Sequence, residues 1–166
     1  MEKIKLPKAV ENEPRSAALA SGLASRAHPL WEGGERCIPH ADLSPALEAA
    51  LKSAFSTGQI VRGFEAAQSA LAAEERGLQN VNRKTGVARG QRISRLLVLA
   101  DDGADRFYRN VEGLLQRHEP RVLALRLSAD ECTLGQLLFG PGEVARLLLV
   151  DHKSAVSAVL LALVER

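Results

Sequence analysis

The chain of 166 residues is long enough for one domain with a hydrophobic core, and 46% of its residues are hydrophobic. The 22 basic and 20 acidic side chains nearly cancel, so the molecule as a whole has no strong electrostatic field, and any nucleic-acid binding must rest on local clusters of charge. The two isolated cysteines exclude a disulfide framework, and we expect a cytoplasmic protein without a secretory signal or a membrane span.

Residues 1–43 contain scattered prolines and charges and few aliphatic side chains. This composition predicts a mostly irregular N-terminal arm, with a short helix near 15–26, that could contact a protein partner. The arm also contains His28, Cys37 and His40, which are three potential metal ligands. A zinc site needs a fourth ligand and tighter spacings, so we predict an ordinary loop and neither a metal nor any other cofactor.

Regular structure is predicted from Ser44 onward, so residues 44–166 form the predicted domain. Ser44 is a good helix N-cap, and apolar residues at helical spacing continue from there to Gly58. A second amphipathic helix is predicted over 64–77. The following residues, about 78–92, have no periodicity of either kind and predict a long inserted loop.

Three apolar runs then alternate with helical patterns. A capping-box pair, Ser128 and Glu131, opens the second of these helices. The runs read "LLVLA" at 96–100, "VLALRL" at 122–127 and "RLLLV" at 146–150. This alternation predicts an α/β fold, a three-layer α/β/α sandwich around a small mixed, largely parallel sheet.

The inserted loop and its flanks are basic without any acidic residue between Arg76 and Ala100. The basic residues of this stretch are Arg76, Arg83, Lys84, Arg89, Arg92 and Arg95. A segment of one charge sign suits contact with RNA phosphates. On charge alone such a run is more often a solvated surface segment, and if this one binds RNA, the predicted contacts are Arg83, Lys84, Arg89 and Arg92.

The stretch "GQIVRGFEAAQSAL" at 58–71 places Gly63 directly before the second helix. A helix N-terminus presents unpaired backbone N–H groups and a partial positive charge, so it binds anions such as phosphate. A glycine at that point lets another backbone approach closely.

Four landmarks occur in order along residues 47–163. They are "TGQIVRGFEAAQSAL" at 57–71, "RLLVLADDG" at 95–103, "LSADECTLGQLLFG" at 127–140 and the apolar strand that follows. In this order and spacing the chain resembles the L-seven-Ae family, the kink-turn RNA-binding ribosomal-protein superfamily, and especially its bacterial members. The resemblance implies a non-enzymatic protein that binds structured RNA, ribosomal or regulatory.

Two loops grip RNA in that family, one leading into the second helix and one before the last strand. Carried onto this chain, the resemblance implies RNA contacts from Arg62, Gly63, Phe64 and Glu65 and from Gly140, Pro141, Gly142, Glu143 and Val144.

Two alternatives remain open. The family usually places an Asn-Glu pair after the glycine and a lysine one turn later, where this chain has Glu65, Ala66 and Ser69. That departure favours a protein-interaction or regulatory module on the same fold. The paired carboxylates Asp101 and Asp102 at a strand end favour instead a receiver-like, metal-binding domain.

Overall fold

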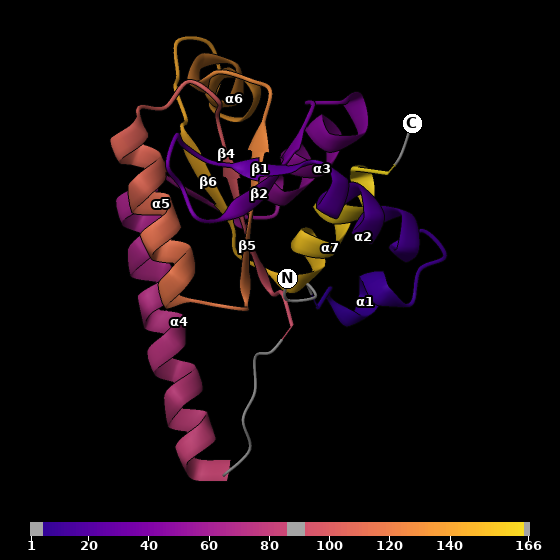
Figure 1. Cartoon of the computed structure of the whole chain (residues 1–166), viewed down its shortest axis with the longest axis vertical. Coiled ribbons are helices and arrows are strands. Elements are labelled where there is room, and N and C mark those ends of the chain that lie inside the picture. Colours follow the sequence, from indigo (N-terminus) through magenta and orange to yellow (C-terminus); the bar gives the residue numbers. More distant parts are fainter. Residues whose placement is uncertain (1–4, 86–91, 165–166) are drawn as a thin grey trace.

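The computed structural model describes residues 5–85 and 92–164, which form a six-stranded sheet with helices on both faces (Figure 1). The strands are ordered β1-β2-β5-β4-β6-β3 across the sheet. Their bounds are β1 (Ala27–Pro29), β2 (Cys37–Ala41), β3 (Ile60–Arg62), β4 (Arg95–Leu99), β5 (Val122–Leu127) and β6 (Leu147–Val150). The predicted α/β sandwich with a mixed sheet is confirmed.

The sheet is less parallel than predicted. Only the pairings of β5 with β2 and with β4 are parallel, whereas β1 with β2, β4 with β6, and β3 with β6 are antiparallel. The reason lies in the short helix α6 (Glu131–Phe139), since the N–H of Ala145 donates to the carbonyl of Glu131 at 2.9 Å. The chain therefore enters β6 at the same end of the sheet at which it left β5. Because β4 is parallel to β5, β6 runs antiparallel to β4.

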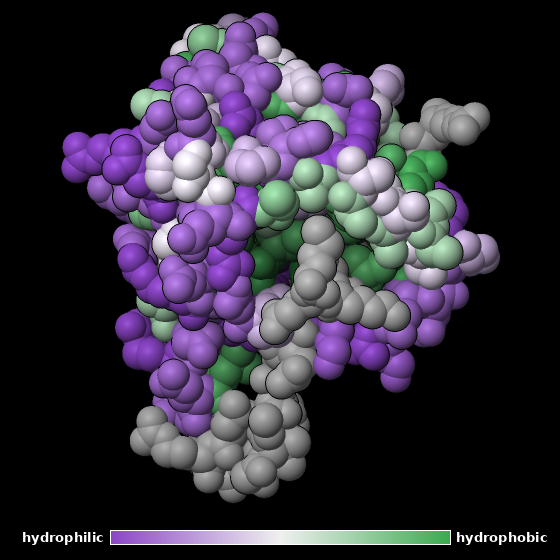
Figure 2. All heavy atoms as spheres, in the orientation of Figure 1, coloured by the Kyte–Doolittle hydropathy of each residue, from purple (hydrophilic) through white to green (hydrophobic). Residues whose placement is uncertain are grey.

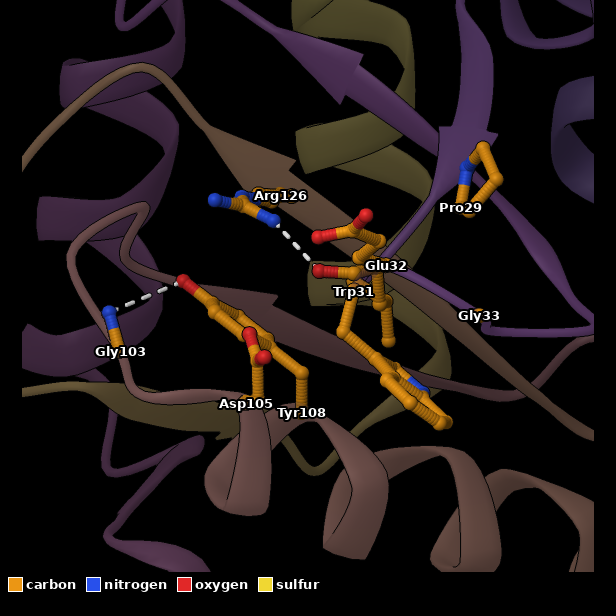
Figure 3. Close-up of a pocket in the computed structure, with 9 residues that line it drawn as sticks. Pro29, Trp31, Glu32, Gly33, Gly103, Asp105, Tyr108 and Arg126 are labelled. Atoms are coloured by element: carbon orange, nitrogen blue, oxygen red, sulfur yellow. Dashed lines mark hydrogen bonds between the residues drawn. The ribbon is translucent and has the colours of Figure 1, made fainter.

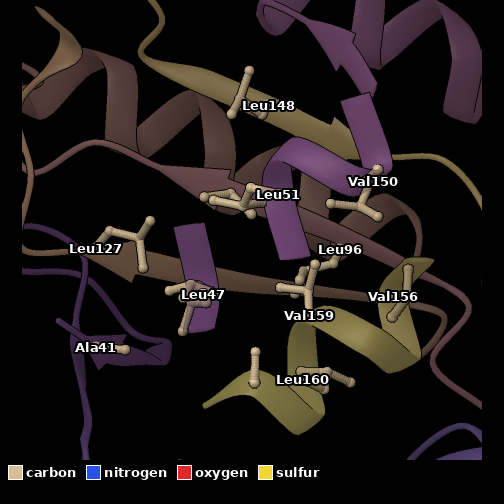
Figure 4. Packing of buried hydrophobic residues seen from close by; sticks show 14 of the residues in the cluster. Ala41, Leu47, Leu51, Leu96, Leu127, Leu148, Val150, Val156, Val159 and Leu160 are labelled. Atoms are coloured by element: carbon tan, nitrogen blue, oxygen red, sulfur yellow. The ribbon is translucent and has the colours of Figure 1, made fainter. Parts of the chain in front are cut away.

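Two hydrophobic clusters separate the layers, because alternate side chains of each strand point to opposite faces. Leu96 and Val98 of β4 belong to one cluster, shown in part in Figure 4, and Leu97 and Leu99 belong to the other. The first face is covered by α1 (Lys8–Glu11), α2 (Ser16–Ser25), α3 (Pro45–Ser56), α6 and α7 (Lys153–Ala162). The second face is covered by α4 (Phe64–Thr85) and α5 (Asp105–Arg117).

Short polar side chains cap the helices α3 and α6. The hydroxyl of Ser44 accepts the N–H of Leu47 at 3.2 Å, which confirms Ser44 as the N-cap of α3. The predicted Ser128 cap of α6 is wrong, because the N–H of Ser128 still donates to Ala41 at the end of β2. Asp130 is the cap instead, and its bonds to the side chain and N–H of Thr133 lower the pKa of its carboxyl group.

The interpretation of residues 1–43 as an irregular arm is wrong for the described residues. This segment contributes α1, α2, β1 and β2, and β2 lies inside the sheet, paired on both sides. Aliphatic side chains of this segment reach the core, since Val10, Leu19 and Leu30 are at most 1% exposed. A low aliphatic density thus hid a segment whose few described large aliphatic side chains are buried, apart from the half-buried Leu43.

The predicted loop at about 78–92 is also wrong in its first half, because α4 continues to Thr85. Gly77 does not end the helix, since it is absent from the glycines that take a positive φ among the described residues. A helical glycine costs about 1 kcal/mol relative to alanine, which the neighbouring helix-forming residues offset.

Within the described ranges, neither α4 nor any other helix is long and apolar enough to cross a lipid bilayer.

Candidate nucleic-acid interface

The structure brings the two predicted RNA loops together. We call residues 62–65 and 140–144 the two-loop surface. The guanidinium of Arg62 donates to the carbonyl of Val144 at 2.6 Å and to the carboxylate of Glu143 at 2.9 Å. The N–H of Gly63 donates to the carbonyl of Leu147 at 2.9 Å. Segments about 80 residues apart in sequence thus form one continuous surface at one edge of the sheet.

Gly135 of α6 allows the second loop to reach this position. A Cβ atom at Gly135 would lie 2.3 Å from the carbonyl oxygen of Glu143 and 2.4 Å from the Cα of Val144. No side chain fits there, because both neighbours are backbone atoms. The "LG" pair of the third sequence landmark therefore has a steric cause, which is the close packing of the loop 140–144 on α6.

Glycines with a positive φ shape both halves of the surface. Gly63 has a φ of +94°, and Gly140 and Gly142 have φ values of +100° and +82°. This region of backbone conformation strongly favours glycine. A Cβ at Gly63 would meet no other atom within 4 Å, so the space in front of this backbone is open to a ligand.

The N-terminus of α4 opens onto the same space. The carbonyl of Gly63 accepts the N–H of Ala67, which is the first bond of the helical ladder. The N–H groups of residues 64–66 precede that bond and have no acceptor among the described residues. The surface therefore offers three backbone donors and the positive end of the helix dipole.

The side chains of the two-loop surface have little net charge. Glu143 neutralises Arg62, and Glu65 and Pro141 are exposed. Phe64 packs against the core between α4 and the sheet, so core packing rather than base stacking explains its ring. Val144 is 45% exposed and adds an apolar side chain.

An aromatic pair lies beside this surface. The guanidinium of Arg62 lies 4.3 Å from the ring centroid of Phe139, and Phe55 meets Phe139 edge-to-face at 5.1 Å. Phe55 is 40% exposed. No sequence pattern predicts this cluster, because the two phenylalanines come from the ends of α3 and α6.

The predicted basic contacts do not join the two-loop surface. Arg83 and Lys84 lie in the last turn of α4, about 30 Å from Gly63 along the helix. Arg89 lies outside the described residues. Arg92 forms an ion pair with Glu11 and donates to the carbonyl of Leu6, so it ties the N-terminal segment to the start of β4.

We call residues 76–85 the α4 extension. In Figure 1 this part of α4 projects away from the sheet, and Figure 2 shows mostly hydrophilic side chains along α4 and α5 on that side. Arg76 is exposed and has no ion pair with any described residue. Arg76 therefore presents its positive charge to solvent, and Arg83 and Lys84 follow it in the same helix.

The acidic pair after β4 has a structural role. The carboxylate of Asp102 accepts the N–H of Glu131 at 3.0 Å, and the N–H of Asp101 donates to the carbonyl of Ala129. No group of three potential ligands that could hold a metal ion occurs in the described part of the chain. The antiparallel β6 also contradicts the parallel sheet of a receiver-like domain.

The three potential metal ligands of the N-terminal segment lie in the β1–β2 hairpin. The rings of His28 and His40 meet edge-to-face at 5.2 Å, and Cys37 is exposed. Burial, followed by the positive charge of Arg126, lowers the pKa of His40. His40 is thereby kept neutral at neutral pH.

Sequence reasoning missed one pocket, which we call the rim pocket. It has a volume of about 460 Å³ and lies between the loop after β1, the end of β5 and the start of α5 (Figure 3). Its lining includes Trp31, Glu32, Gly103, Asp105, Tyr108 and Arg126. The available signals were a lone arginine in the apolar run 122–127 and the single tryptophan of the chain.

Tyr108 and Arg126 fix the shape of the rim pocket. The Tyr108 hydroxyl donates to the carbonyl of Ala100 at 2.6 Å and accepts the N–H of Gly103 at 3.1 Å. Burial raises the pKa of Tyr108, so its hydroxyl stays protonated. These bonds hold the loop after β4, which is one wall of the pocket.

No family model and no curated protein matches this chain. Among solved structures, the chain is similar to a protein with unknown function from Bacillus halodurans C, with 17% sequence identity and a TM-score of 0.48. The match covers 74% of this chain and 100% of that one.

Proposed function

We propose that this protein binds structured RNA through the two-loop surface, assisted by the positive charge of the α4 extension. The observation that carries the proposal is the contact between residues 62–63 and 143–147, which places two glycine-shaped loops around the open N-terminus of α4. Both loops are the ones that the resemblance to the L-seven-Ae family implies.

The two-loop surface supplies contacts that depend on RNA shape. Its free N–H groups suit one phosphate group at the start of α4. The open space before Gly63 accommodates a backbone at close range. A surface with so little net charge gains affinity only from an RNA that fits it.

The α4 extension supplies attraction that does not depend on shape. Its residues Arg76, Arg83 and Lys84 are followed along the chain by further basic residues and by no acid before Asp101. Neutralising phosphates releases counterions, so this contribution weakens as salt rises. The helix projects far enough to reach an RNA strand that is already held at the two-loop surface.

A matched pair of glycine variants tests the proposal. Gly63 and Gly58 both have a positive φ and open space for a Cβ, but only Gly63 lies in the two-loop surface. Gly63→Ala and Gly58→Ala should lower stability alike, by about 1–2 kcal/mol. Only Gly63→Ala should change how the protein ranks a panel of folded RNAs, measured by electrophoretic mobility or filter binding.

The parent protein sets the reference for this comparison. We expect it to bind folded RNA at low salt and to bind more weakly at higher salt. An absence of RNA binding at low salt would contradict the proposed function. So would an identical RNA ranking by the Gly63→Ala variant and the parent.

One observation favours a second candidate, a protein-interaction module. Arg62 is already paired with Glu143, and the exposed side chains of Phe55 and Val144 lie near this pair. Apolar side chains beside a neutralised ion pair suit a protein partner better than phosphate. Loss of all RNA binding, together with capture of a partner that Phe55→Ser abolishes, would favour this candidate.

A further inference from the structure

The rim pocket contains hydrogen-bond donors held in a fixed plane. The guanidinium of Arg126 donates to the carbonyl of Leu30 at 2.7 Å and to that of Asp101 at 3.0 Å, and it lies 4.3 Å from the ring centroid of Tyr108. A guanidinium has five N–H groups, and no other acceptor for them is found among the described residues. The remaining donors are therefore available to a ligand.

The same pocket contains acceptors. Glu32 and Asp105 line it from opposite sides, from the loop after β1 and from the first turn of α5 (Figure 3). Both side chains are exposed, and neither has an ion pair or hydrogen bond within the described residues. Two carboxylates disfavour a phosphate in this pocket and favour a neutral group with N–H donors.

The place of the pocket in the sheet is typical of ligand sites in α/β proteins. The chain passes from β4 to α5 on one face and from β5 to α6 on the other, so the two crossovers diverge at the carboxyl ends of β4 and β5. Ligands bind at such switch points. A volume of about 460 Å³ is within the usual range for small-molecule sites.

We propose that the rim pocket binds a guanine base. Guanine presents the acceptors O6 and N7 on one edge, which arginine recognises, and N–H donors on the edge beside it, which a carboxylate accepts. Arg126 supplies the first kind of partner, and Glu32 and Asp105 supply the second. Adenine lacks this pattern, because it has an amino donor where guanine has O6.

This inference goes beyond the proposed function, because the pocket is separate from the two-loop surface. Arg126 lies on β5 and Arg62 on β3, which are three strand spacings, about 14 Å, apart in the sheet. The base can belong to a free nucleotide or to an unpaired guanosine of a bound RNA, since both present the same edges.

The single tryptophan of the chain, Trp31, lines the pocket and reports on its occupant. We expect guanosine to cause a saturable change in Trp31 fluorescence and to shift its only indole N–H resonance, whereas adenosine leaves both unchanged. Guanosine has no phosphate, so its affinity should not depend on salt. No saturable change with guanosine, or equal changes with both nucleosides, would overturn the inference.

Carboxylate variants test the contacts. Glu32→Gln and Asp105→Asn should each weaken guanosine binding roughly tenfold or more. Glu35→Gln is the matched control, because Glu35 is exposed in the same hairpin loop but does not line the pocket. Equal effects of Glu32→Gln and Glu35→Gln would contradict the assignment, provided that all three variants melt like the parent.

Two further measurements separate this inference from the proposed function. Gly63→Ala should leave guanosine binding unchanged, so guanosine can bind even if the two-loop surface binds no RNA. An oligonucleotide with one unpaired guanosine that displaces bound guanosine assigns the base to RNA. Retention of guanosine in its presence assigns the base to a free nucleotide, and either result supports the pocket.

Discussion

The two-loop surface and the α4 extension differ in whether their described basic side chains are paired with acidic ones. Arg62 in the two-loop surface is neutralised by Glu143, and the shape of the surface comes from glycines. Arg76 in the α4 extension has no ion pair with a described residue. The shaped surface at the start of α4 and the basic residues near its end are thus separate features, about 20–30 Å apart along one helix.

The difference arises from the positions of the acidic residues of α4 and from the ion pairs that they form. Glu74 pairs with Arg95 and Arg121, and Glu75 pairs with Arg121 and lies 3.8 Å from the ring of His118. These ion pairs fix the middle of α4 to the first residue of β4 and to the residue before β5. The charged residues that follow Glu75 in the helix are all basic.

The largest expected effect comes from breaking this anchor. Arg121 is 6% exposed, and Arg121→Met leaves Glu74, which is 21% exposed, with Arg95 alone and removes the ion pair of Glu75, which is 37% exposed. Because both carboxylates keep some contact with water, we expect a loss of about 2–4 kcal/mol in the free energy of unfolding, measured by chemical denaturation. Arg117→Met, at an exposed site of α5, should change it by less than about 0.5 kcal/mol. Similar losses for both variants would show that α4 is not anchored by these ion pairs.

The next effect concerns the shape of the two-loop surface. Gly135→Ala places a Cβ against the backbone of residues 143–144 and should destabilise the protein by about 1–3 kcal/mol. Gly113→Ala in α5 has no atom within 4 Å of its Cβ and should stabilise it by up to about 1 kcal/mol. Thermal melts of both variants show whether each change in stability has the expected direction. A Gly135→Ala protein as stable as the parent would refute the steric role of Gly135.

A smaller effect separates electrostatic attraction to RNA from recognition of RNA shape. Changing Arg76, Arg83 and Lys84 together to Gln should reduce the slope of log affinity against log salt by up to about one unit per lost phosphate contact, for all RNAs alike. The control changes Lys52, Arg106 and Arg117, which are exposed elsewhere, to Gln. If both triple variants flatten the slope equally, the α4 extension has no special role.

The smallest effect is a pH dependence at the anchor. Burial lowers the pKa of His118 despite the opposing influence of Glu75. The unfolded chain therefore binds a proton more readily than the folded one, and stability should fall as pH drops below about 6.5, by about 1 kcal/mol or less. His118→Gln should reduce the slope of the unfolding free energy between about pH 7 and about pH 5.5. An unchanged slope would show that His118 does not titrate differently on folding.

Local patterns predicted much of the fold. The N-cap at Ser44, the helix starting at Phe64 and the apolar strands of the C-terminal half are encoded by neighbouring residues. The direction of β6 is not, because it depends on the loop that packs against Gly135. The strand β2 was missed for a similar reason, since its pairing with β5 joins residues far apart in sequence.

The candidate sites divide in the same way. Gly63, Gly140 and Gly142 could be found from the sequence, because backbone positions with a positive φ are usually occupied by glycine. The pairing of Arg62 with Glu143 and the rim pocket could not be found, because each joins elements through tertiary contacts alone. The continuation of α4 through Gly77 was missed because glycine ends many helices but is tolerated within one.

Amide resonances provide the most direct test of RNA binding at the two-loop surface. A folded RNA should be titrated into the isotope-labelled protein at low salt while backbone N–H shifts are followed. We expect the largest shifts at residues 63–66 and 140–144, and smaller shifts along 76–85 that disappear as salt rises. Shifts confined to residues 76–85, or no shifts at all, would contradict the claim that the two-loop surface recognises RNA.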